Sequence, residues 1–248
     1  MAKGLGDEDI IKVNQSALSK TEIRLDKKKG DFMDELTAIS DSIRRTLTTK
    51  SVARDATIAR SRELIRHCSE CIRAIHRREW PAADSKLEII RAAAGELRAG
   101  VMGYADLYHS GYTQDALKEV VEAFATYAII RETALPSPES LEVEAATYLN
   151  GLAEAATELR RFILDIMRRT DSHSDEAERL LGWMDAIYDE LVTFDFPDAL
   201  TGGLRRQTDI VRGVLERTRG DLTSSLRQQQ LQNALQRFEG RVIGDTEK

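Results

Sequence analysis

The stretch LRRQTDIVRGVLERTRGDLTSSL (204–226) decides the fold class, because its apolar and small hydroxyl side chains recur at steps of three and four residues. Steps of this size gather side chains into one stripe along an α-helix. The stripe consists of Leu204, Thr208, Val211, Leu215, Thr218, Leu222 and Leu226. The segment therefore predicts a long helix that packs against the rest of the protein through this stripe.

The rest of the chain has the same helical character. Among its 248 residues, 31% are charged, 6% are aromatic and only 4 are prolines. Ala, Leu, Arg and Glu are abundant, and these residues lose little side-chain freedom in a helix. We find no alternating run of β-branched residues bounded by turns, which would predict a strand. We therefore expect an all-α, single-domain bundle of about seven helices over residues 1–248, with 1–7 and 240–248 frayed.

Glycine, proline and capping residues suggest where these helices end. Gly30 closes the first helix, a break is possible near 48–51, and Pro81 stops the second helix because the residue before a proline avoids the α region. Thr113 and Ser140 are suitable N-cap residues. The expected helical stretches are 8–28, 31–79, 83–98, 101–109, 113–132, 141–169, 174–193 and 204–238.

Charge is distributed unevenly along the chain. The net charge of −6 argues against non-specific binding of nucleic acid by the whole surface. Residues 44–78, however, contain ten basic and three acidic residues, whereas residues 115–190 contain seven basic and seventeen acidic ones. Four arginines of the basic region share one narrow helical stripe: Arg62, Arg66, Arg73 and Arg77. This arginine stripe suits the regular phosphates of a nucleic acid, although a solvated face paired with neighbouring acids is also possible.

The cysteines and the lack of long apolar runs indicate the compartment. The N-terminus does not resemble a signal peptide, and no run of 18 apolar residues occurs. Cys68 and Cys71 are too close for a disulfide framework, and their spacing to His67 and His76 is wrong for zinc, so we interpret them as core residues. We expect a soluble, cytoplasmic protein without a membrane partner.

Two pairs of glutamates are candidates for metal binding. Glu119 and Glu122 are three residues apart on one expected helix, and Glu154 and Glu158 are four apart on another. Like charges at these spacings repel, and no lysine stands at a compensating position within the pairs. Two such pairs could hold Mg²⁺ or Mn²⁺, which prefer oxygen ligands, although glutamate pairs are also common on solvated helices. A ferritin-like di-iron site is disfavoured, because no histidine stands three residues after these glutamates.

At these residues the chain resembles the translin family, in particular its Trax-like branch of archaeal or bacterial type. The segments that carry the resemblance are YLNGLAEAATELRR (148–161), LKEVVEAF (117–124) and LRRQTDIVRGVLERTRGDL (204–222), with a looser match over 54–78. The resemblance implies an all-α fold, a hollow octameric shell, and binding of RNA and single-stranded DNA. It also implies that Glu119, Glu122, Glu154 and Glu158 form a metal-dependent endoribonuclease centre.

The chain departs from the family pattern in two places. Glu154 stands where the Trax pattern has Asp, which keeps the charge but adds a methylene. Upstream of the first glutamate pair, where relatives have His and Arg, only His109 could take their place.

Three hypotheses follow. The leading one is a Trax-like endoribonuclease in which the four glutamates hold Mg²⁺ or Mn²⁺, so that water attacks an RNA phosphodiester and one glutamate serves as general base. The second is a translin-like scaffold that binds RNA or single-stranded DNA without chemistry, and the third is a helical adaptor for a protein partner. We expect a homo-oligomer, an octamer by resemblance, because the longest helices exceed what one domain of this size needs to bury.

Overall fold

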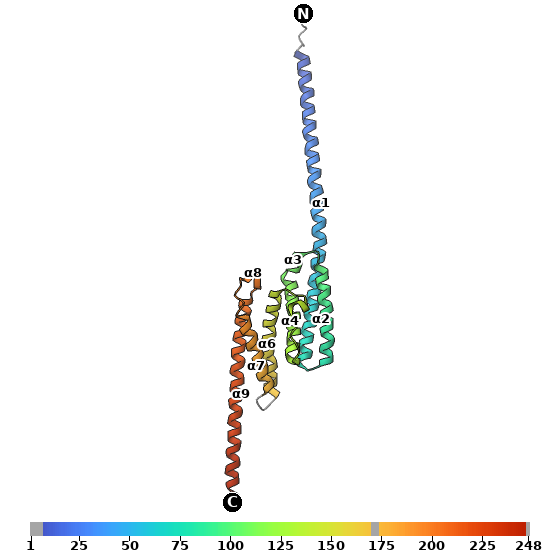
Figure 1. Cartoon of the computed structure of the whole chain (residues 1–248). Helices are drawn as coiled ribbons and strands as arrows, with labels where there is room; N and C mark the ends of the chain where they lie inside the picture. Colours follow the sequence, from blue (N-terminus) through green and yellow to red (C-terminus); the bar gives the residue numbers. More distant parts are fainter. Residues whose placement is uncertain (1–6, 170–173, 247–248) are drawn as a thin grey trace. The chain divides into compact units, whose positions relative to one another are not determined.

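The computed structural model describes residues 7–169 and 174–246, with side chains over 32–169 and 174–239. Every regular element in these ranges is an α-helix, which confirms the all-α prediction (Figure 1). The helices are α1 (Asp7–His76), α2 (Trp80–Val101), α3 (Ala105–Tyr108), α4 (Gly111–Arg131), α5 (Pro138–Leu141), α6 (Ala145–Arg169), α7 (Asp175–Leu191), α8 (Asp198–Thr201) and α9 (Leu204–Thr246). Among the described residues, no helix combines the length and the apolar character needed to span a bilayer.

The chain divides into two compact units, residues 1–54 and residues 55–248. In the first unit, residues 7–54 belong to α1. The second unit contains the remainder of α1 and all the later helices, and its buried apolar side chains form one continuous cluster. The candidate glutamates and the arginine stripe all lie in this second unit.

The prediction of separate helices at 8–28 and 31–79 is wrong, because α1 continues without interruption from Asp7 to His76. Gly30 does not end the helix, since one interior glycine costs only about 1 kcal/mol relative to alanine. No break occurs near 48–51 either. There the hydroxyls of Thr48 and Thr49 donate to backbone carbonyls one turn earlier, at 2.8 and 3.1 Å. Their hydrogen bonds are therefore satisfied inside the helix.

Several helix ends also differ from expectation. α1 ends at His76, and Arg78, two residues later, has a left-handed φ of 58°. Pro81 does not stop a helix but lies in the first turn of α2, where a backbone N–H has no partner within the helix and its absence costs no hydrogen bond. α4 begins before Thr113, which is buried and donates its hydroxyl to a backbone carbonyl at 2.7 Å. Ser140 is not the cap of α6. It lies in the short helix α5, whose first turn is capped by the side chain of Ser137.

α6 is the central helix of the second unit, in contact with α4, α7 and α9 (Figure 1). The stripe predicted on α9 is confirmed, since five of its members are buried: Leu204, Val211, Leu215, Thr218 and Leu222. α4 and α6 approach each other closely at Gly151, where an added Cβ would lie 2.5 Å from the Cβ of Val121 and 2.7 Å from the carbonyl oxygen of Lys118. Only glycine permits this approach, and it brings the two glutamate pairs toward each other.

Candidate metal-binding site

Three of the four predicted glutamates come together between α4 and α6. Carboxylate oxygens of Glu119, Glu122 and Glu154 all lie within 4.8 Å of one another, and each residue is half-buried. We call this group the carboxylate cluster. In α4 the spacing of three residues puts two of the carboxylates on one side of the helix, and Glu154 of α6 faces them from one turn beyond Gly151.

Burial and neighbouring carboxylates disfavour ionisation of two members of the carboxylate cluster. Burial, followed by the charges of Glu119, Glu154 and Glu158, raises the pKa of Glu122 to about 8. Burial and the charge of Glu154 also raise the pKa of Glu119. Both effects penalise the ionised carboxylate, and a bound cation would offset that penalty.

Lys118 supplies a positive charge that the sequence analysis missed. Its Nζ lies 2.7 Å from Oε1 of Glu154 and 4.0 Å from a carboxylate oxygen of Asp115. The second oxygen of Glu154, Oε2, is buried and has no hydrogen-bond partner among the described residues. Lys118 and Glu154 lie on different helices, so no spacing rule within one helix could reveal the pair.

Glu158 stands apart from the carboxylate cluster and is bonded to His76, a second residue that the sequence analysis missed. Nε2 of His76 donates to Oε1 of Glu158 at 2.5 Å. The same oxygen of Glu158 lies 3.6 Å from Nη1 of Arg161. The structure therefore groups three of the predicted glutamates and gives the fourth a different set of neighbours.

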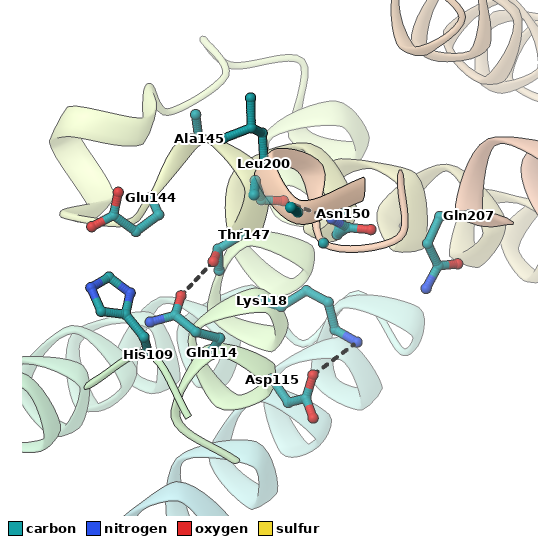
Figure 2. Close-up of a pocket in the computed structure, with 13 residues that line it drawn as sticks. His109, Gln114, Asp115, Lys118, Glu144, Ala145, Thr147, Asn150, Leu200 and Gln207 are labelled. Atoms are coloured by element: carbon teal, nitrogen blue, oxygen red, sulfur yellow. Dashed lines mark hydrogen bonds and ion pairs between the residues drawn. The ribbon is translucent and has the colours of Figure 1, made fainter. Parts of the chain in front are cut away.

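Lys118 is also one of the residues that line a cavity of about 800 Å³ (Figure 2). Its ion pair with Glu154 connects this cavity to the carboxylate cluster. The cavity wall is braced by Gln114, which accepts from the hydroxyl of Thr147 at 2.5 Å and donates to the carbonyl of Tyr108 at 2.7 Å. Asn150 ties this wall to α8 by donating to the carbonyl of Thr201 at 2.8 Å. The other labelled lining residues are His109, Asp115, Glu144, Ala145, Leu200 and Gln207.

All four residues of the arginine stripe are exposed. Arg66 lies 3.2 Å from Glu63 on the same helix. In the part of the chain that the structure describes, the other three have no carboxylate within ion-pair distance. His109, which could substitute for the family's upstream basic residues, is exposed and lines the cavity, and its ring is nearly perpendicular to that of Tyr108.

The cysteines are core residues, as predicted. Cys68 and Cys71 are fully buried free thiols, and burial raises the pKa of Cys71 to about 12. Zinc requires the thiolate, which burial of this kind disfavours. Among the described residues, the carboxylate cluster is the sole group of three or more potential ligands with metal-binding geometry.

Comparison with known proteins gives relatives over most of the chain, although no family model matches it. The uncharacterized protein MJ0175 of Methanocaldococcus jannaschii is 31% identical over 209 residues, which cover 84% of this chain and 90% of that protein. Among solved structures, AfC3PO in a complex with duplex RNA superposes with a TM-score of 0.64 at 34% identity, over 75% of this chain and 95% of that one.

Two further structures have the same fold. A second crystal structure of AfC3PO superposes with a TM-score of 0.64 at 32% identity, again over 75% of this chain and 95% of that one. The apo form of NeC3PO superposes with a TM-score of 0.66 at 21% identity, over 75% of this chain and 96% of that one.

Proposed function

Because this chain belongs to the C3PO family of translin-fold proteins, we propose that it is a Trax-like, metal-dependent endoribonuclease that acts in a homo-oligomer. One observation carries the proposal: Glu119, Glu122 and Glu154 place carboxylate oxygens from two helices within 4.8 Å of one another. The relative AfC3PO forms a complex with duplex RNA, which supports RNA as the ligand. Single-stranded DNA is a further ligand that the resemblance to translin implies.

The carboxylate cluster fits Mg²⁺ or Mn²⁺. All the ligand atoms are oxygens, as these hard cations prefer. Oε2 of Glu154 is buried without a hydrogen-bond partner among the described residues, and the raised pKa of Glu122 reflects charges that a cation would offset. When bound, such a cation would act as a Lewis acid, making water more acidic and offsetting charge on a phosphodiester.

The residues around the carboxylate cluster would place the RNA. The cavity next to Lys118 is large enough for part of a nucleotide chain, since ligand sites typically occupy ~300–1,000 Å³. Lys118 joins the cavity to the cluster, so its ammonium group is placed to contact a phosphate that approaches Glu154. His109 on the cavity wall offers a further polar contact.

The exposed arginine stripe on α1 supplies sequence-independent affinity in this proposal. Arg62, Arg73 and Arg77 are exposed and without ion-pair partners among the described residues, so binding phosphate would break no existing pair. Guanidinium groups bind phosphate oxygens in a fixed fork geometry. Such contacts release counterions from the nucleic acid and make binding strongly salt-dependent.

Exposed apolar side chains support assembly into an oligomer, which we take to be an octamer by resemblance. In the unit of residues 1–54, side chains at steps of three and four remain 49–67% exposed: Phe32, Leu36, Ile39, Ile43 and Leu47. A long apolar stripe of this kind marks an interaction surface in a soluble protein. Light scattering should give a mass well above that of one chain. A monomer mass at micromolar concentration would contradict the oligomer.

We place the assembly in the cytoplasm, where free thiols such as Cys68 and Cys71 stay reduced.

A translin-like scaffold that binds nucleic acid without chemistry is the second candidate. The ion pair between Lys118 and Glu154 favours it, because an ammonium group already neutralises one carboxylate of the cluster. The two candidates differ in one respect: only the nuclease requires the cluster to hold a cation.

The deciding experiment incubates the full chain with end-labelled single-stranded and duplex RNA, in the presence of Mg²⁺, Mn²⁺ or EDTA. The nuclease should cleave with a metal and not with EDTA, and Glu122→Gln should bind RNA without cleaving it. Glu96→Gln is the matched control, since Glu96 is an exposed glutamate on α2 outside the cluster. Metal-independent binding with no cleavage under any condition would leave the scaffold.

A further inference from the structure

His76 is held in an unusual setting at the end of α1. Its side chain is only 7% exposed, and its ring stacks on Phe162 with 3.7 Å between ring centroids and 11° between planes. Nε2 donates to Glu158 at 2.5 Å, and Nδ1 lies 3.7 Å from Asp165. Glu158, Phe162 and Asp165 follow one another at steps of four and three residues, so one face of α6 surrounds the ring.

This contact fixes Glu158 from outside its own helix. An ionised carboxylate can only accept hydrogen bonds, so the hydrogen of the pair resides on Nε2. Oε1 of Glu158 is committed to His76, while no described residue bonds Oε2. The stacking on Phe162 restricts rotation of the imidazole, and this restriction extends to the carboxylate that it holds.

The contact also separates Glu158 from the other three glutamates. Glu158 is not among the residues whose oxygens converge within 4.8 Å, although its charge is close enough to raise the pKa of Glu122. A carboxylate near a cation site, but with one oxygen already bonded to histidine, is suited to accepting a proton from water beside that site.

We propose that His76 is a positioning residue that orients Glu158 as the general base, while Glu119, Glu122 and Glu154 hold the cation. The assignment rests on the proposed nuclease function and divides the four acids into two roles. The attacking water gives its oxygen to phosphorus and one proton to Oε2 of Glu158. The bond from phosphorus to the leaving ribose oxygen breaks, and that oxygen takes a proton from the solvent.

The test compares His76→Leu, which keeps an apolar group on Phe162, with His76→Gln, whose amide can replace the Nε2 donor. His67→Gln is the matched control, because His67 is another histidine of α1 with little exposed side chain, and it lies 3.9 and 3.8 Å from carboxylates of its own helix, those of Glu63 and Glu70. For each full-length variant we would measure kcat and KM for RNA cleavage, Mn²⁺ affinity by titration, and the thermal midpoint.

A positioning role predicts that His76→Leu lowers kcat by about 10–100-fold, the usual effect of removing a residue that orients a site group. KM and Mn²⁺ affinity should remain within a few fold of wild type. His76→Gln should recover most of kcat, and His67→Gln should behave as wild type.

Four outcomes would overturn the proposal, and they are distinguishable. A wild-type kcat in His76→Leu would show that His76 has no role in cleavage. If His76→Gln loses as much kcat as His76→Leu, the hydrogen bond donated to Glu158 is not what matters. Loss of Mn²⁺ affinity in parallel with kcat makes Glu158 a metal ligand. A wild-type protein that cleaves no RNA with either metal defeats the nuclease function itself, and the role of His76 with it.

Discussion

Gly151 of α6 lies so close to Val121 of α4 that a Cβ added to the glycine would stand 2.5 Å from the Cβ of the valine. Helices can approach this closely only where a side chain is absent. Gly151 lies one turn before Glu154, and Val121 precedes Glu122, so the separation of these helices sets the distances within the carboxylate cluster.

Gly151→Ala should therefore separate the two helices and weaken metal binding. Overpacking of this kind costs about 1–3 kcal/mol of stability. Urea unfolding should show that loss, and Mn²⁺ titration should show lower affinity, because the carboxylates of α4 and α6 move apart. Gly95→Ala on α2 is the control, since an added Cβ there meets nothing within 4 Å. The control should gain up to about 1 kcal/mol from better helix propensity. Unchanged metal affinity in Gly151→Ala would contradict the role of this approach.

Glu122 should make the metal-free protein less stable as the pH rises. Its pKa is raised from 4.5 to about 8 in the folded protein, so folding favours the protonated form. The contribution of Glu122 to the free energy of unfolding is therefore fully present below about pH 4.5, and it is lost as the pH rises to about 8. Each tenfold difference in proton affinity corresponds to about 1.4 kcal/mol. In EDTA, the thermal midpoint of wild type should therefore fall across this range relative to that of Glu122→Gln.

Added Mn²⁺ should remove much of this pH dependence in wild type, because the cation favours the ionised carboxylate. It should do so much less in Glu122→Gln, which lacks the charge. If the thermal midpoints of the two proteins depend on pH in the same way in EDTA, folding does not raise the pKa of the Glu122 carboxyl.

Periodicity predicted those parts of the fold whose cause is local in sequence. The stripe of α9 is buried where the steps of three and four residues placed it, at Leu204, Val211, Leu215 and Leu222. The spacing of Glu119 and Glu122 likewise placed both on one side of α4. Breaks were predicted less well, since Gly30 lies inside a long helix that tolerates it.

Contacts between helices could not be predicted in this way. Lys118 pairs with Glu154, and His76 bonds Glu158 across 82 residues of sequence. Neither partner stands at a helical spacing from the glutamate it contacts, so the sequence predicted four equivalent acids. One signal was present in hindsight: Gly151 sits in an otherwise helix-favouring segment, which points to a close helix approach.

Alanine substitutions of the glutamates should separate the two proposed functions. Glu119→Ala, Glu122→Ala and Glu154→Ala should each reduce RNA cleavage by roughly a hundredfold or more, because fewer carboxylates remain to hold the cation. RNA affinity should stay within a few fold, since the arginine stripe lies elsewhere. Gel-based cleavage and fluorescence anisotropy measure the two effects, with Glu96→Ala as the control. Full cleavage in Glu154→Ala would remove α6 from the site.

The same variants should differ in stability without metal. Glu119→Ala and Glu122→Ala relieve repulsion between carboxylates and should unfold at a higher temperature. Glu154→Ala leaves Lys118 without its closest partner and should show no such gain. Glu158→Ala leaves Nε2 of the buried His76 unpaired, at a cost of about 1–3 kcal/mol. Equal shifts of the unfolding temperature in all four variants would mean that the contacts with Lys118 and His76 do not make the four glutamates differ in stability.

The last prediction concerns the arginine stripe and the salt dependence of RNA binding. If Arg62, Arg66, Arg73 and Arg77 contact phosphates, each change to Ala should lower the slope of log affinity against log salt by somewhat under about one unit. In the fourfold Ala variant the slope should fall by several times the change that one substitution causes. The thermal midpoint should stay near that of wild type, because all four side chains are exposed. Anisotropy titrations with a catalytically inactive Glu122→Gln background would measure this without cleavage. The control is a fourfold Ala variant of exposed arginines on α9, namely Arg205, Arg206, Arg212 and Arg217. It changes the net charge equally, so a general effect of charge would lower both slopes alike. An unchanged slope in the α1 variant would instead show that this stripe is a solvated face.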